Sequence, residues 1–213
     1  MLYLRRKTKW KTDAEDAASK SVLRYAKDDD IAKSNYEYNS TIDLSKYDGK
    51  YINDQNTGPV SQLKFGNRQM YYNGCEIIAT YNAMRTLGKP EDIRDIAYEY
   101  EKDGKMLGGE FGTNPYAAQR YFERKGYKVE TVKGEDIVNK KTPDADAYIL
   151  SYWNTDNVMD MLHTVAIEKD KNGEYVFYND DARYEKEVRE TEIQNRIKVE
   201  EYQPIILQCI SEK

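Results

Sequence analysis

Apolar and polar positions follow two different periods along the chain, and the change occurs near residue 126. Before it, apolar residues recur three and four positions apart over 75–87 and 91–103, which predicts two helices that end near Gly88 and Gly104. A third helix is predicted to begin at Pro115, capped by Thr113 or Asn114, and to end at Gly126. A weaker helical pattern covers 13–27, and the polar stretch 28–60 is expected to be irregular.

After residue 126 the pattern becomes that of β-strands. Short runs rich in β-branched and aromatic residues predict strands over 127–132, 147–153, 163–169, 174–179 and 204–210. The DKNG sequence between the third and fourth runs is typical of a hairpin turn. Helices followed by hairpin-connected strands indicate an α+β fold with an antiparallel sheet, and not the winding of βαβ units.

Composition and charge argue against several classes of protein. The chain has 213 residues with one His and two Cys, which are too few for a zinc site with four Cys/His ligands. A net charge of −5 argues against a nucleic-acid-binding face, and the basic residues within the first eleven are interpreted as a solvated end. No apolar run approaches the roughly 20 residues of a transmembrane helix.

The sequence does not settle where the protein resides. The first residues lack the apolar core of a signal peptide, so a cytoplasmic location is expected as written, or a secreted one if a leader has been removed. The oligomeric state also stays open.

Cys75 is the candidate nucleophile. It lies in the first turn of a predicted helix, where the helix dipole is expected to stabilise a thiolate. His163, the only histidine, begins a predicted strand and is the only imidazole that could act as its base. Gln69, six residues before the cysteine, could donate its amide to an oxyanion. Asn179, sixteen residues after the histidine, could orient the imidazole.

These spacings carry a family resemblance. Gln69 and Cys75, followed by His163 and Asn179, resemble the papain-like cysteine peptidases in order and spacing. The segments 73–88, 108–129 and 163–181 look like the C39-like branch of that clan, which includes bacterial double-glycine leader peptidases. The resemblance covers residues 60–181 and the last strand.

The resemblance implies a fold, a division of the chain and an activity. It implies a helical subdomain carrying the Cys, packed against an antiparallel sheet subdomain carrying the His, with the cleft between them. Residues 58–213 would be the catalytic domain, and residues 1–57 an extension outside it. The implied activity is hydrolysis of a peptide or protein substrate, with no cofactor and no metal.

Two positions depart from the family pattern. Glu76 stands where many members have Gly, and it would either raise the pKa of the Cys75 thiol or point to solvent. Asp180 is the other candidate for the third catalytic residue, because Asp is frequent near this strand end in related sequences. Since adjacent strand residues face opposite sides, only one of Asn179 and Asp180 can serve, and Asn179 is favoured.

Other readings stay open. An inactive module that binds peptides, or an effector domain that uses the Cys-His pair for deamidation or acyl transfer, would carry the same residues. Cys209 alternates with Ile205 and Leu207 and is expected to be a core thiol. The glycine-rich loop at 108–112 lacks a phosphate-binding pattern; it either lines the cleft or turns the chain toward Pro115.

Overall fold

A computed structural model describes residues 25–110, 112–153, 162–180 and 187–213. The helix predicted over 13–27 lies outside these residues except for its last three positions. Within the described part, no helix is long and apolar enough to cross a membrane.

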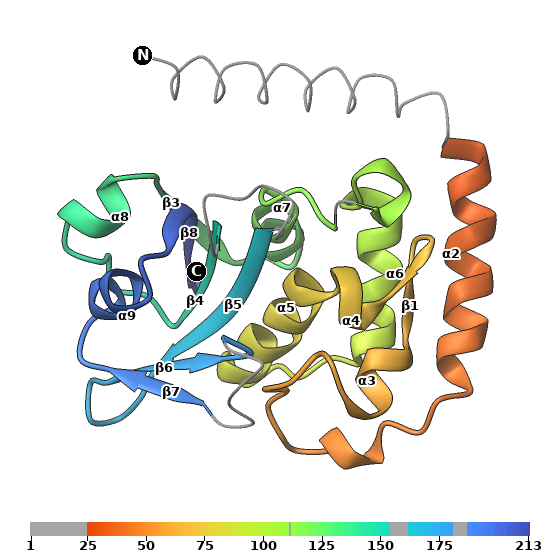
Figure 1. The fold of residues 1–213 in the computed structure, drawn as a ribbon, viewed down its shortest axis with the longest axis horizontal. Helices are drawn as coiled ribbons and strands as arrows, with labels where there is room; N and C mark the ends of the chain where they lie inside the picture. Colours follow the sequence, from red (N-terminus) through yellow and green to blue (C-terminus); the bar gives the residue numbers. More distant parts are fainter. Residues whose placement is uncertain (1–24, 111, 154–161, 181–186) are drawn as a thin grey trace.

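The first half of the chain is mainly helical (Figure 1). Its elements in chain order are α2 (Tyr25–Ser40), the 3-10 turn η2 (Ser45–Tyr47), α3 (Gly58–Gln62), the short hairpin β1 (Lys64–Phe65) and β2 (Arg68–Gln69), α4 (Met70–Asn73), α5 (Cys75–Thr86), α6 (Ile93–Asp103), the 3-10 turn η3 (Leu107–Gly109) and α7 (Ala117–Arg124).

The second half forms a six-stranded antiparallel sheet in the order β3-β8-β4-β5-β6-β7. The strands are β3 (Lys128–Lys133), β4 (Ala147–Trp153), β5 (Leu162–Lys169), β6 (Tyr175–Tyr178), β7 (Val188–Glu190) and β8 (Gln203–Ser211), and the helices α8 (Asp136–Asn139) and α9 (Ile193–Val199) interrupt them. The fold is therefore α+β, as the sequence predicts.

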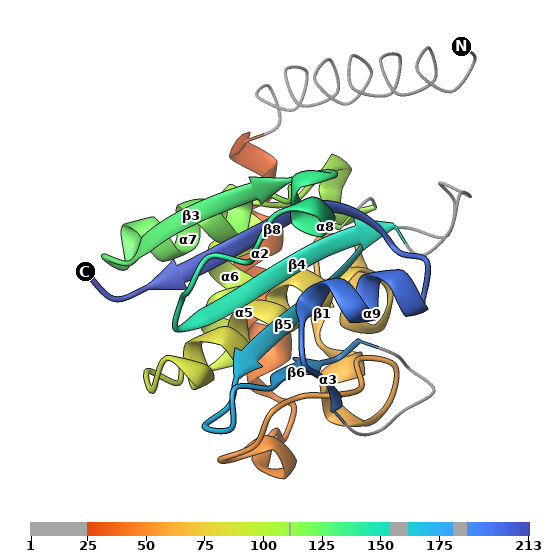
Figure 2. The same ribbon diagram turned by 90° about the vertical axis from the view of Figure 1, so that its left-hand side faces the viewer.

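Each face of the sheet has its own core. Alternate residues such as Ile149 and Ala166 pack with α5, α6 and α7 in the larger core. Their neighbours, including Tyr148 and Leu150, pack with α8 and α9 in the smaller one. Figure 2 shows α9 in front of the sheet and α5 to α7 behind it. Cys209 belongs to the smaller core at 2% exposure, which confirms the expectation of a buried thiol.

The pattern predicted α5 and five strands of the six-stranded sheet closely and missed β7, and the helical half differs from the prediction in two places. The helix predicted to begin at Pro115 begins at Ala117, because the Asn114 side chain accepts from the Tyr116 N–H and holds a turn before it. The irregular stretch predicted over 28–60 contains most of α2. Its buried positions include Ala32, Asn35 and Asn39, so the helix has little apolar periodicity to detect.

The two buried asparagines attach α2 to the rest of the fold. Asn39 accepts from the Lys64 N–H at 2.7 Å and donates to the Lys64 carbonyl at 3.0 Å, so its amide pairs with β1 as a strand would. Asn35 donates to the Gly66 carbonyl and to Glu101 of α6, both at 2.8 Å. Residues from α2 are thus packed on the hairpin and α6, while the domain boundary at residue 57 remains a prediction.

Candidate active site

A sharp turn between two helices places Cys75. Helix α4 ends at Asn73, Gly74 follows, and Cys75 begins α5, which is buried along most of its length. A Cβ at Gly74 would lie 2.3 Å from the Met70 Sδ and 2.8 Å from the Met70 carbonyl oxygen. Only glycine allows the two helices to meet so closely, so the NG sequence before the cysteine fixes where the thiol stands.

The thiol packs against the start of β5, the strand that carries His163. Cys75 Sγ lies 3.8 Å from the carbonyl oxygen of Leu162, the residue before the histidine. Thr164, the residue after it, also hydrogen-bonds the sulfur. The start of α5 and the start of β5 are thereby brought together where the helical half meets the sheet.

The thiol is not the stabilised thiolate that the helix start predicts. Cys75 is only 9% exposed, and burial raises its pKa from 9.0 to about 11, with the nearby Glu76 carboxylate as the second cause. Hydrogen bonds from Thr164 and the Glu76 backbone act in the other direction but are smaller. Burial opposes ionisation, so the thiol stays protonated near neutral pH unless a base takes the proton.

His163 is held by a main-chain carbonyl. Its Nε2 lies 2.6 Å from the Asn179 carbonyl oxygen, which can only accept a hydrogen bond. Nε2 therefore carries a proton, and in the neutral ring the lone pair is on Nδ1. Tyr152, opposite His163 on β4, packs its ring edge-to-face with the imidazole at 5.7 Å between centroids. Together these contacts set the tautomer and the tilt of the ring.

The side chain of Asn179 contacts Gln55 instead of the imidazole. Its Oδ1 accepts from the Gln55 N–H at 3.1 Å, and its Nδ2 donates to the Gln55 Oε1 at 3.0 Å. The backbone of Asn179 is left-handed, with φ of 62°, a conformation that Asn tolerates better than most residues. Asn179 thus contacts His163 through its carbonyl oxygen and not through its side chain.

Gln55 is a residue of this region that the sequence did not single out. It is 9% exposed, and its Nε2 donates to the Tyr71 carbonyl at 3.1 Å, so it links Asn179 to α4 just before the cysteine. It lies within a polar stretch without periodicity, and its partner Asn179 is 124 residues away. No local pattern in the sequence marks such a contact.

The carboxylate of Asp180 is buried and is bound by two other side chains. It accepts from Arg196 Nε at 2.6 Å and from the Tyr152 hydroxyl at 2.9 Å, and the ion pair is almost fully buried. Both oxygens of its carboxylate are therefore bound by residues of the smaller core. Asp180 lies next to the residue that holds His163 and anchors that part of the chain to α9.

Gln69 lies on β2 at the N-terminal end of α4 and is exposed. Its backbone pairs with Lys64 in the small hairpin. The structure thus places Gln69 on the chain that leads to Cys75, while the oxyanion role of its side chain remains a prediction.

Glu76 is buried, so the alternative in which it points to solvent is wrong. It is 1% exposed, and its carboxylate accepts from the Ala118 N–H at 3.0 Å and from the Thr113 hydroxyl. Burial raises its pKa from 4.5 to about 7, although both hydrogen bonds and the charge of Arg120 oppose the shift. The Glu76 carboxyl is a second titratable group directly beside the thiol.

The described residues contain no group of three or more His, Cys, Asp or Glu side chains that could hold a metal ion. The chemistry available to this site is that of a thiol, an imidazole and hydrogen-bond donors.

Comparison with known proteins gives a likeness in structure but none in sequence. No family model matches the chain, and no curated protein matches its sequence. In structure the chain is similar to the peptidase domain of Streptococcus ComA, a bi-functional ABC transporter involved in a quorum-sensing pathway, solved by crystallography. The two share 11% identity at a TM-score of 0.46, over 76% of this chain and 99% of the ComA domain.

Proposed function

We propose that the protein is a cysteine peptidase, or a hydrolase of a related amide bond, with a papain-like arrangement of Cys75 and His163. The observation that supports this most strongly is the packing of the thiol against the strand start that carries His163, the only imidazole of the chain. The hydrogen bond of Nε2 to the Asn179 carbonyl leaves Nδ1 as the basic nitrogen of the neutral ring.

In this mechanism His163 takes the proton of the Cys75 thiol, and the thiolate attacks the substrate carbonyl. The tetrahedral intermediate collapses when His163 returns the proton to the leaving amine, which gives a thioester acyl-enzyme. Water, deprotonated by the same imidazole, then hydrolyses the thioester and restores the thiol. Because the resting thiol has a raised pKa, the imidazolium formed in the first step must stabilise the thiolate.

The oxyanion would be bound at the start of α5. The Cys75 N–H is at the first position of the helix, where main-chain donors have no partner within the helix. Gln69 remains the proposed side-chain donor, and the third catalytic position is assigned to Asn179, acting through its carbonyl oxygen. Asp180 then has a structural role, since its carboxylate is bound by Arg196 and Tyr152.

Replacing each cysteine in turn tests this assignment. Cys75→Ala is expected to abolish cleavage of a peptide library and labelling by a thiol-directed electrophile, because it removes the nucleophile. Cys209→Ala is the matched control: its thiol is buried in the smaller core, and burial raises its pKa to about 12. Labelling of both cysteines at equal rates, unaffected by His163→Ala, would contradict the proposal.

A second candidate is a papain-like module that binds peptides without cleaving them. The buried, protonated Cys75 and the engagement of the Asn179 side chain by Gln55 favour it. The two candidates separate in one measurement. A peptide that binds wild type and Cys75→Ala with equal affinity, and is cleaved by neither, indicates the binding module.

A further inference from the structure

The proposed mechanism leaves Glu76 without a role, although it is the residue directly after the nucleophile. Its charge acts on three titratable or charged side chains: Cys75 on its own helix, Tyr100 on α6 and Arg120 on α7. Burying a carboxyl group is costly, and an apolar residue would fill the same core position without that cost. The two hydrogen bonds that Glu76 accepts, from the Thr113 hydroxyl and the Ala118 N–H, show what the carboxylate holds.

The Thr113 hydroxyl belongs to the glycine loop, which we define as residues 105–110, 112 and 113. The loop is closed by a β-bridge between Lys105 and Thr113 and by the hydrogen bond from the Met106 N–H to the Gly112 carbonyl at 2.9 Å. Ala118, the other partner of Glu76, lies in the first turn of α7, the helix that follows the loop. Glu76 therefore hydrogen-bonds both the end of the glycine loop and the start of α7.

Asn73, which precedes the cysteine in the sequence, hydrogen-bonds the same loop. Its Nδ2 donates to the Gly109 carbonyl at 2.7 Å and to the Phe65 carbonyl at 3.0 Å. A Cβ at Gly109 would lie 2.9 Å from that nitrogen, and the residue has φ of 89°, so the approach requires glycine. The residues two before and one after Cys75 thus bind one loop at two points, Gly109 in its middle and Thr113 at its end.

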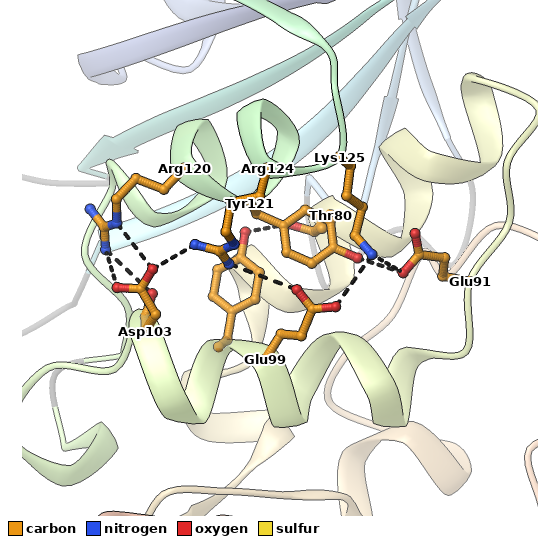
Figure 3. Close-up of polar contacts among 9 residues, drawn as sticks. Thr80, Glu91, Glu99, Asp103, Arg120, Tyr121, Arg124 and Lys125 are labelled. Atoms are coloured by element: carbon orange, nitrogen blue, oxygen red, sulfur yellow. Dashed lines mark hydrogen bonds and ion pairs between the residues drawn. The ribbon is translucent and has the colours of Figure 1, made fainter. Parts of the chain in front are cut away.

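Helix α7 is also held to α6 by ion pairs. Figure 3 shows acidic residues of α6 facing basic residues of α7: Arg124 lies 2.6 Å from Asp103, and Lys125 lies 2.8 Å from Glu91 just before α6. Arg120 also pairs with Asp103, at 3.3 Å. Because α7 is held to α6 in this way, the contact of Glu76 with its first turn fixes the glycine loop relative to the thiol.

We propose that Glu76 is a positioning residue that holds the glycine loop beside Cys75, and that its ionised carboxylate restrains ionisation of the thiol. This inference rests on the proposed function, because Glu76 can affect catalysis only if Cys75 is the nucleophile. Its two parts are separable: the hydrogen bonds position the loop, and the charge acts on the sulfur. Glu76→Gln keeps the shape and removes the charge, whereas Glu76→Ala removes both.

The test is the pH dependence of Cys75 alkylation by iodoacetamide, followed by mass spectrometry of the Cys75 peptide. Because the carboxylate charge opposes ionisation of the thiol, Glu76→Gln is expected to lower the apparent pKa of Cys75 and to speed alkylation several-fold near pH 8. A shift of one pKa unit changes the thiolate fraction about tenfold. Glu110→Gln is the matched control, since Glu110 lies in the same loop but pairs with Arg68 at the surface.

The rate of trypsin cleavage after Lys105 measures the positioning of the loop separately. The Lys105 side chain is nearly buried, so trypsin reaches it only when the loop moves away. Thr113→Val and Glu76→Ala are expected to increase that rate, and Glu76→Gln is expected to stay close to wild type. Alkylation profiles of Glu76→Gln and wild type that superimpose, or cleavage rates equal in all variants, would overturn the inference.

The outcome is independent of the proposed function. A shifted alkylation profile without any peptide cleavage supports the inference while the peptidase proposal fails. Peptide cleavage by a Glu76→Gln variant with an unshifted alkylation profile overturns the inference alone.

Discussion

Asn179 and Asp180 are adjacent but make different kinds of contact, one through its main chain and the other through its side chain. The Asn179 carbonyl holds His163, and the Asp180 carboxylate holds Arg196 of α9. Because Asp180 is anchored by Arg196 and Tyr152, it also fixes the position of the Asn179 carbonyl group that precedes it. At this site orientation of the imidazole therefore depends on a backbone group whose place is set by side-chain contacts on either side of it.

That geometry makes a prediction about the resting imidazole. Since Nε2 faces a carbonyl oxygen, we expect neutral His163 to be the Nε2–H tautomer. Because the chain has one histidine, long-range ¹H–¹⁵N NMR correlations of the imidazole can be assigned without ambiguity. A spectrum dominated by the Nδ1–H tautomer at a pH where the ring is neutral would contradict this arrangement.

Candidate site residues could be predicted from the sequence where only one residue of the required type was available. The contacts that those residues make could not be predicted. The sequence singles out His163 as the candidate base because it is the only imidazole, and Cys75 as the candidate nucleophile because Asn73-Gly74 precedes a helix start. Strand alternation indicated that only one of Asn179 and Asp180 could serve. It did not reveal the Gln55 side chain that binds Asn179, because that contact depends on tertiary packing over 124 residues.

At the scale of elements, the hairpin of β1 and β2 is too short to be stable by itself, and α2 supplies what it lacks. The Asn39 side chain satisfies both backbone polar groups of Lys64, which an edge strand would leave without a partner. The same hairpin leads into α4 and Cys75. The sequence pattern missed α2 because asparagine, and not an apolar residue, occupies its buried face.

We therefore expect Asn39→Ala to lower the free energy of unfolding by about 2–4 kcal/mol, because two backbone groups lose their partner. Ser40→Ala is the neighbouring control: its exposed hydroxyl bonds only to Tyr36 of its own helix, and we expect a change of about 0.5 kcal/mol or less. Urea unfolding measures both. Equal effects of the two substitutions would mean that α2 contributes little to the hairpin.

For the whole molecule, the antiparallel sheet and central helix were predictable because each is continuous in sequence and strongly patterned. The strands at 147–153 and 163–169 alternate or run apolar throughout, so β4 and β5 are found almost at their observed bounds. The short elements α3, α4, α8 and β7 were not predicted. They have three to five residues each, and their structure depends on packing more than on their own sequence.

The buried Glu76 also makes the stability of the whole molecule depend on pH. Its pKa is about 7 in the folded protein and near 4.5 when unfolded. Between these values the folded state holds a proton that the unfolded state has released, so the stability contributed by this group is present below pH 4.5 and is lost as pH rises toward 7. The loss is about 3 kcal/mol over the whole window.

Glu76→Gln removes this group from the titration without removing its volume. The unfolding free energy of the variant minus that of wild type is therefore expected to rise by about 3 kcal/mol between pH 4.5 and 7 and to level off above it. Taking the difference cancels carboxyl groups that titrate equally in both proteins, such as Asp92, whose pKa is lowered by its bonds to Arg94. Urea unfolding at half-unit pH steps measures the curve, with Glu110→Gln as the exposed control. A flat difference curve would show that Glu76 ionises in the folded protein as it does in the unfolded chain, and the carboxylate would then carry its charge beside Cys75 throughout the pH range of the proposed reaction.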